Sequence, residues 1–216
     1  MALKNEKLQL GGAVLVAAFL WFCMFSPWTS GHFNFWLEMS CAAIVLTTLT
    51  LVFTPDRKAL FKADRPLLQM VSGVLIAFVL WGVFWMGDKI SALLFDFARP
   101  EVDAVYAMKT GLPSYAIALL LLVLIGPAEE LFWRGYVQRT LSRLLPGKRP
   151  ADYAFVVTTL VYSLVHIWSF NFMLVMAALV AGVVWGFIYR LCPKALPALI
   201  ISHALWDALV FVILPI

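Results

Sequence analysis

The sequence contains few charged residues for its length. Only 13% of its 216 residues are Asp, Glu, Lys or Arg, about half the share in a soluble globular domain, whereas 63% are hydrophobic. The mean hydropathy is +0.93. This composition excludes an ordinary soluble domain and predicts an integral membrane protein.

Cysteines and familiar metal motifs are also scarce. Cys23, Cys41 and Cys192 are widely separated and form no Cys-x-x-Cys pair, and no His-Glu-x-x-His occurs. We therefore expect small buried side chains at these positions, and neither a disulfide framework nor a cysteine metal cluster. Apolar and polar residues do not alternate with a period of two, which argues against a transmembrane β-barrel.

Seven apolar runs are long enough to cross about 30 Å of hydrocarbon as helices. Lysines precede the first run, as in a signal peptide, but no small-x-small cleavage site follows, so we expect a retained span. The predicted fold class is an all-α integral membrane protein with seven transmembrane helices plus short amphipathic interfacial helices. The predicted spans are Leu8–Ser26, Asn34–Phe53, Pro66–Met86, Pro113–Trp133, Ala151–Trp168, Phe172–Leu191 and Ala195–Leu214.

The basic residues predict the orientation of these spans. If the N-terminus is cytoplasmic, the inside segments hold 13 of the 16 Lys and Arg residues, and only Lys89, Arg99 and Lys109 lie outside. Because basic residues are retained in cytoplasmic loops, we predict the N-terminus inside and the C-terminus outside. The net charge of +4 therefore reports topology and does not indicate a nucleic-acid partner.

The chain is predicted to form one transmembrane domain, residues 1–216, with two parts. Residues 1–112 hold three spans and a longer outer segment, in which Ile90–Phe97 is expected to form a short amphipathic interfacial helix. Residues 113–216 form a four-span core, whose first helix is expected to continue to about Leu145. The sixth span carries a small-xxx-small stripe typical of close helix packing: Ala178, Gly182 and Gly186.

Strongly polar residues within the core are functional candidates, because ionisable groups in hydrocarbon are costly. Glu130 and Arg134 are four residues apart and share a helix face, so Arg134 is expected to neutralise Glu130. Glu129 is rotated by about 100° and is expected to face a cavity. Pro127 should disturb the helix just before the acids.

Counting along the helical hairpin predicts a partner for Glu129. Glu129 precedes Lys148 by 19 residues and His166 follows it by 18, so both should lie about 27–29 Å from the turn. His203 and Asp207 share a face of the last span but begin only about 12 Å from its inner end. Helix tilt or the extension of the fourth helix must reconcile these levels.

Glu and His at one depth permit several functions. A carboxylate can take a proton from water while an imidazole orients that water, and a second His can stabilise an oxyanion. Spacing alone leaves open hydrolysis, a proton path in a transporter, and a polar network that stabilises helix association.

Three motifs resemble those of a known family. Glu129-Glu130-x-x-x-Arg134, Tyr162-x-x-x-His166 and His203-x-x-x-Asp207 occur in this order. They resemble the motifs of the CPBP family, the CAAX protease and bacteriocin-processing (Abi) intramembrane endopeptidases. The resemblance covers about Pro113 to the C-terminus, so residues 113–216 would be the catalytic core.

The resemblance implies a protease that acts without a covalent intermediate. Glu129 would activate water with the help of His166, and His203 with Asp207 would form the oxyanion site. Structural support would come from Glu130, Arg134 and Tyr162.

Two positions depart from the family pattern. Tyr162 stands where Phe is usual, and Asp207 stands where Asn is usual. An ionised Asp cannot donate to an oxyanion, so Asp207 must be protonated or must orient His203. We predict no cofactor; the alternative is zinc bound by Glu129, His166 and His203.

The expected substrate is a membrane-embedded or lipidated peptide or protein tail within the lipid bilayer. Cleavage of CAAX tails competes with processing of secreted peptides, immunity functions and maturation of anchored surface proteins. The alternatives are a non-catalytic membrane immunity or scaffold protein and a proton-coupled secondary transporter. The chain's compactness and the family's distribution favour a prokaryotic cytoplasmic membrane.

Overall fold

A computed structural model of the protein describes residues 2–32 and 34–216, with only the backbone given for residues 2–4. Seven helical segments are long and apolar enough to cross a membrane, which confirms the predicted all-α, multi-pass fold. They are Asn5–Phe25, Phe35–Phe53, Pro66–Leu94, Ser114–Leu144, Pro150–Ser169, Phe172–Leu191 and Pro193–Ile213.

The first, second, third and sixth spans are single α-helices, whereas the fourth, fifth and seventh are composite. The α-helices outside the fourth span are α1 (Ala2–Phe25), α2 (Phe35–Phe53), α3 (Pro66–Leu94), α4 (Ala98–Ala107), α8 (Pro150–Leu164), α9 (Phe172–Leu191) and α10 (Leu196–Ala208). The fourth span comprises α5 (Ser114–Leu120), α6 (Gly126–Glu130) and α7 (Arg139–Leu144), joined by wider π-helical turns at Leu121–Ile125 and Leu131–Gln138. The remaining short turns are Arg57–Leu60, Val165–Ser169, Pro193–Ala195 and Leu209–Ile213.

Local sequence signals account for several helix starts. The Asn34 side chain accepts hydrogen bonds from two backbone N–H groups at the start of α2. The Asn171 side chain accepts one from the backbone N–H of Leu174 at the start of α9. Pro66 and Pro150 occupy the first positions of α3 and α8, where a missing N–H costs no helical hydrogen bond.

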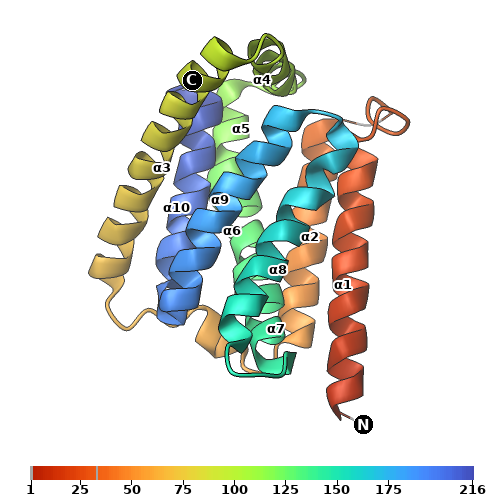
Figure 1. The fold of residues 1–216 in the computed structure, drawn as a ribbon, viewed down its shortest axis with the longest axis vertical. Coiled ribbons are helices and arrows are strands. Elements are labelled where there is room, and N and C mark those ends of the chain that lie inside the picture. Colours follow the sequence, from red (N-terminus) through yellow and green to blue (C-terminus); the bar gives the residue numbers. More distant parts are fainter. Residues whose placement is uncertain (1, 33) are drawn as a thin grey trace.

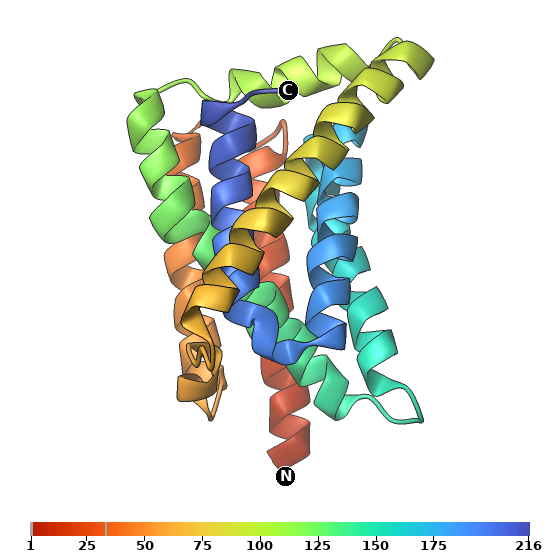
Figure 2. The same cartoon turned by 90° about the vertical axis from the view of Figure 1, so that its left-hand side faces the viewer.

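The helices form an up-and-down bundle with two distinct ends (Figures 1 and 2). The N-terminus and the turns before α3, α8 and α10 lie at one end, which we call the N-terminal end. Helix α4 and the C-terminus lie at the other, which we call the α4 end. Helix α3 packs along α10, and α8 packs against α9.

The predicted interfacial helix at Ile90–Phe97 is wrong. Helix α3 continues to Leu94, and a separate helix, α4, begins at Ala98. The longer α3 carries Asp88, whose buried carboxylate is paired with Arg99 and Lys89. Pro100 lies in the first turn of α4, where proline is tolerated, and marks the true helix start.

The fourth span continues as helix to Leu144, in agreement with the predicted extension. The helix is also disturbed just before the acids: Leu121–Ile125 widens, and the backbone N–H of Gly126 bonds to the carbonyl of Leu121. A wider turn therefore accommodates Pro127, which has no N–H to donate.

Candidate active site

Glycines at two helix crossings bring the last span against the acids. A Cβ on Gly126 would lie 2.6 Å from the Cα of Ala204, so α6 and α10 approach to backbone contact there. A Cβ on Gly73 of α3 would lie 2.6 Å from the carbonyl oxygen of Ala198 on the opposite flank of α10. Only glycine permits these approaches, and they place His203 at the level of Glu130, resolving the mismatch in depth.

Glu130 is bound by two basic side chains at once. Its Oε1 lies 2.7 Å from Arg134 Nη1, as the i, i+4 spacing predicts, and both side chains are fully buried. The same oxygen lies 3.0 Å from His203 Nδ1, a contact that the sequence did not indicate. Because a carboxylate accepts, Nδ1 carries the proton in this bond and Nε2 points the other way.

Nε2 of His203 points toward Asp207. The distance from Nε2 to Asp207 Oδ2 is 3.6 Å, too long for a hydrogen bond but close enough for electrostatic interaction. Trp185 stacks on the His203 ring with centroids 3.9 Å apart and donates a hydrogen bond to Ser202 Oγ. Sequence reasoning missed Trp185, although it lies between Gly182 and Gly186 of the small-residue stripe.

His166 has hydrogen bonds at both ring nitrogens. Nδ1 lies 2.9 Å from the carbonyl oxygen of Tyr162, which can only accept, so Nδ1 carries the proton. Nε2 accepts a hydrogen bond of 3.0 Å from the indole N–H of Trp21 in α1. Sequence reasoning placed every candidate in residues 113–216 and missed Trp21, which no motif or spacing connects to His166.

The small-residue stripe on α9 packs closely, as predicted, and also supplies hydrogen-bond acceptors. A Cβ on Gly182 would lie 3.1 Å from the Tyr162 ring. The carbonyl oxygen of Gly182 accepts a hydrogen bond from Arg134 Nη2, and that of Gly186 accepts one from Gln138. Because these residues lack bulky side chains, the α9 carbonyl oxygens are accessible to Arg134 and Gln138 of the fourth span.

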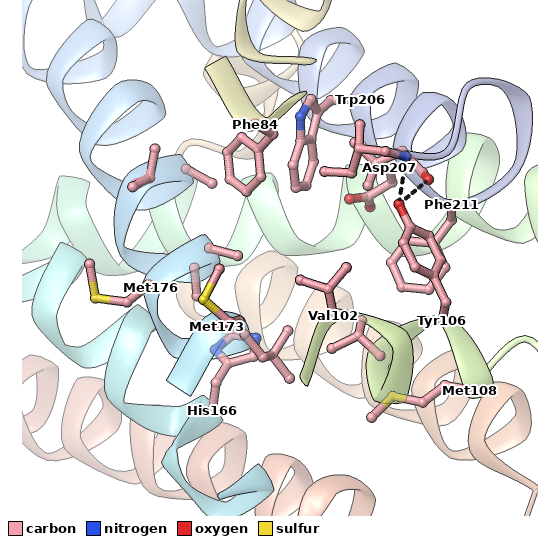
Figure 3. A pocket seen from close by; sticks show the side chains of 18 of the residues that line it. Phe84, Val102, Tyr106, Met108, His166, Met173, Met176, Trp206, Asp207 and Phe211 are labelled. Carbon is pink, nitrogen blue, oxygen red and sulfur yellow. Dashed lines mark hydrogen bonds between the residues drawn. The ribbon is translucent and has the colours of Figure 1, made fainter. Parts of the chain in front are cut away.

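Glu129 faces a cavity of about 340 Å³. The side chains of Tyr162, His166, His203 and Asp207 line the same cavity, and Figure 3 shows His166 and Asp207 among its walls. Among the described residues, the ion pairs of the site join Glu130 to Arg134 and His203, and His203 to Asp207, and none includes Glu129. The extra hydroxyl of Tyr162 lies near the Glu129 carboxylate.

Helix α4 lies across the cavity and is tied to three spans. Glu101 accepts a hydrogen bond from a backbone N–H in the first turn of α9, and Arg99 pairs with Asp88 of α3 at 3.2 Å. Tyr106 donates to the carbonyl oxygen of Val210 at 3.1 Å (Figure 3). Burial raises the pKa of Tyr106, so its hydroxyl keeps the proton that it donates.

The proposed zinc ligands do not form a coordination site in this arrangement. Both nitrogens of His166 are occupied by protein groups, and Nδ1 of His203 is bound to Glu130. In the part of the chain that the structure describes, no three His, Cys, Asp or Glu side chains are grouped as metal ligands. The residues present therefore do not fit zinc without rearrangement of His166.

Comparison with known proteins finds a family similarity over the segment that carries the motifs. Residues 111–209 match the family model described as type II CAAX prenyl endopeptidase Rce1-like. No curated protein and no solved structure matches the chain significantly. The matched segment contains the three motifs and supports a CAAX-type intramembrane protease. Over residues 111–209 the chain is therefore similar to the Rce1-like type II CAAX prenyl endopeptidases of the CPBP family.

Proposed function

We propose that the protein is an intramembrane endopeptidase that hydrolyses a peptide bond in a membrane-associated or lipidated polypeptide. The supporting observation is that Glu129 faces the same buried cavity as His166, His203 and Asp207, free of the ion pairs that hold Glu130. A carboxylate in this position can accept a proton from a water molecule as that water attacks a carbonyl carbon.

His203 and Asp207 would stabilise the oxyanion. Nδ1 of His203 is bound to Glu130, so its Nε2 is the atom available to the cavity. Donation from Nε2 requires the imidazolium form, whose charge the adjacent Glu130 carboxylate would balance. A protonated Asp207 would supply a second donor.

His166 would act after a local change. In the free protein its Nε2 accepts from Trp21, so no lone pair is open to water. We assign to His166 the orientation of the attacking water once a bound substrate displaces the Trp21 indole. Tyr162, beside Glu129, would hold the carboxylate in place.

The membrane context is also part of the proposal. We propose a prokaryotic cytoplasmic membrane with the N-terminus inside, because the basic residues gather at the N-terminal end and the chain is compact. No cofactor is invoked, and the proposal predicts that cleavage survives chelation and exhaustive metal removal.

The deciding experiment compares wild type with Glu129→Gln in detergent, using a panel of apolar membrane peptides. Glu129→Gln should lower the cleavage rate by about 10³-fold or more while the thermal unfolding midpoint stays unchanged. Glu38→Gln, the same substitution outside the cavity, serves as the matched control. Equal cleavage by Glu129→Gln and wild type would reject the mechanism, and no cleavage by any variant would favour the immunity or scaffold alternative.

A further inference from the structure

We propose that a second, smaller cavity at the N-terminal end of the bundle binds the phosphodiester headgroup of a membrane phospholipid. This headgroup site lies apart from the cavity at Glu129 and does not depend on the proposed protease chemistry. Its volume of about 80 Å³ is enough for several water molecules, and therefore for a phosphate group, against about 340 Å³ for the cavity at Glu129.

The headgroup site lies between the end of α2 and the end of the fourth span. Half of its lining comes from α2 with the turn that follows, and half from the fourth span: Phe53, Thr54, Pro55 and Asp56, and Gly135, Arg139, Thr140 and Arg143. Helix α7 and the end of α2 lie at the N-terminal end of the bundle (Figure 1). Because lipid phosphates lie just outside the hydrocarbon, where spans end, the site is at the depth of the headgroups.

The fourth span supplies two arginines to the headgroup site. Arg139 and Arg143 are four residues apart and share a helix face. Arg143 Nη2 lies 3.4 Å from Glu6 Oε2 of α1. Arg139 is half-buried, and no carboxylate among the residues that the structure describes pairs with it. A half-buried guanidinium without a counter-charge favours an anion, and its planar fork matches two phosphate oxygens.

The end of α2 supplies a hydroxyl group to the same site. Thr54 is only 6% exposed, and its Oγ1 is buried without a hydrogen-bond partner among the described residues. Buried hydroxyls that lack a partner are uncommon, because each one costs the free energy of its lost hydration. Thr54 therefore indicates that a ligand oxygen completes its hydrogen bonding.

The charge around the headgroup site favours a phosphate with a single negative charge. Asp56 also lines the site, and its Oδ1 accepts a hydrogen bond of 3.3 Å from the backbone N–H of Ala59. Its carboxylate would repel a phosphomonoester, which carries about −1.5 to −2 charges near neutral pH. A phosphodiester carries a single negative charge, which Arg139 can balance. Basic cavities between spans are a recurrent type of lipid headgroup site.

A bound headgroup would brace the segment next to the candidate active site. Gly135 of the headgroup site belongs to the wide turn Leu131–Gln138, which also carries Arg134. Helix α2 packs against this turn. A phosphodiester held by Arg139 and Thr54 would join α2 to the fourth span, so the bound lipid should raise the thermal unfolding midpoint.

Native mass spectrometry tests the headgroup site without requiring activity. The full chain is delipidated in dodecyl maltoside and mixed with dioleoyl phosphatidylglycerol. Arg139→Gln should retain about tenfold less lipid than wild type, whereas Arg149→Gln, at an exposed arginine of the same end, should match wild type. Thr54→Val, which removes only the hydroxyl, should lower retention about fivefold. Equal retention by Arg139→Gln and Arg149→Gln, or by Thr54→Val and wild type, would overturn the proposal.

Thermal unfolding in the same detergent separates the possible sources of the phosphate. Phosphatidylglycerol should raise the unfolding midpoint of wild type by several degrees and leave that of Arg139→Gln unchanged. Neither dioleoylglycerol, which has the same acyl chains without phosphate, nor millimolar inorganic phosphate should raise the midpoint of wild type. An equal rise with inorganic phosphate would assign the site to a free anion, and an equal rise with dioleoylglycerol would assign the effect to acyl chains. Either result would overturn the proposal.

Discussion

The two parts of the chain contribute differently to the same site. In the apolar stretches of the fourth and seventh spans, 56% and 61% of residues are buried, against 17–33% in the first three spans. The buried spans carry Glu129, Glu130 and His203, and the family match begins only at residue 111. Yet Trp21 of α1 donates a hydrogen bond to His166, and α3 packs closely against α10 at Gly73. The candidate site residues are thus concentrated in residues 113–216, while residues 1–112 pack against them and supply one hydrogen bond to His166.

The largest expected effect within the core is that of Glu130→Ala. It would leave Arg134 as an unpaired buried charge and release His203, lowering the free energy of unfolding by about 3–5 kcal/mol. Thermal unfolding in detergent measures the loss, with Glu38→Ala as the matched control. A variant that unfolds like wild type but cleaves nothing would make Glu130 catalytic, contrary to its proposed supporting role.

A clash introduced from the N-terminal part should have the next largest effect. Gly73→Ala puts a Cβ 2.6 Å from the Ala198 carbonyl, so α3 and α10 must separate. We expect a loss of about 1–3 kcal/mol in unfolding free energy, together with lower cleavage because α10 carries His203. Gly82→Ala is the control, because a Cβ added at this position of the same helix has nothing within 4 Å. It should change neither the unfolding free energy nor the cleavage rate. Equal behaviour of the two variants would contradict the close approach.

Trp21→Phe tests the contact between the two parts directly. The substitution keeps an aromatic ring but removes the N–H that His166 accepts, which should cost about 1 kcal/mol because cavity water can replace the donor. Cleavage should fall about tenfold as the imidazole loses its orientation. Trp28→Phe, at a largely exposed tryptophan, should change neither quantity. If both variants behave alike, α1 contributes only hydrophobic packing.

The smallest effect is expected for Asp207→Asn. An amide at this position can donate to an oxyanion without being protonated, so cleavage should stay within a few-fold of wild type. Steady-state rates measured at neutral pH are sufficient. Complete loss of cleavage in a folded protein would count against Asp207 in the oxyanion site and assign it a role that requires the carboxylate.

Much of the architecture follows from local sequence patterns. Apolar runs predicted seven spans, and the four-residue spacing predicted the pair between Glu130 and Arg134. The error at Ile90–Phe97 came from ending the third span at Met86, before the charged Asp88, although Pro100 signals a helix start near Ala98. The half-exposed Arg99 pairs with the buried Asp88 carboxylate and allows it to remain inside the longer α3.

What the sequence by itself determined is the set of helices and the residues that share a face on each, because hydropathy and the helical repeat act over a few turns. Only the tertiary structure decided which groups meet across helices. The Trp21–His166 bond joins residues 145 apart, and the Glu130–His203 bond joins residues 73 apart. Such contacts depend on the rotation and separation of packed helices, which glycines such as Gly126 set at single crossings. No local repeat carries that information.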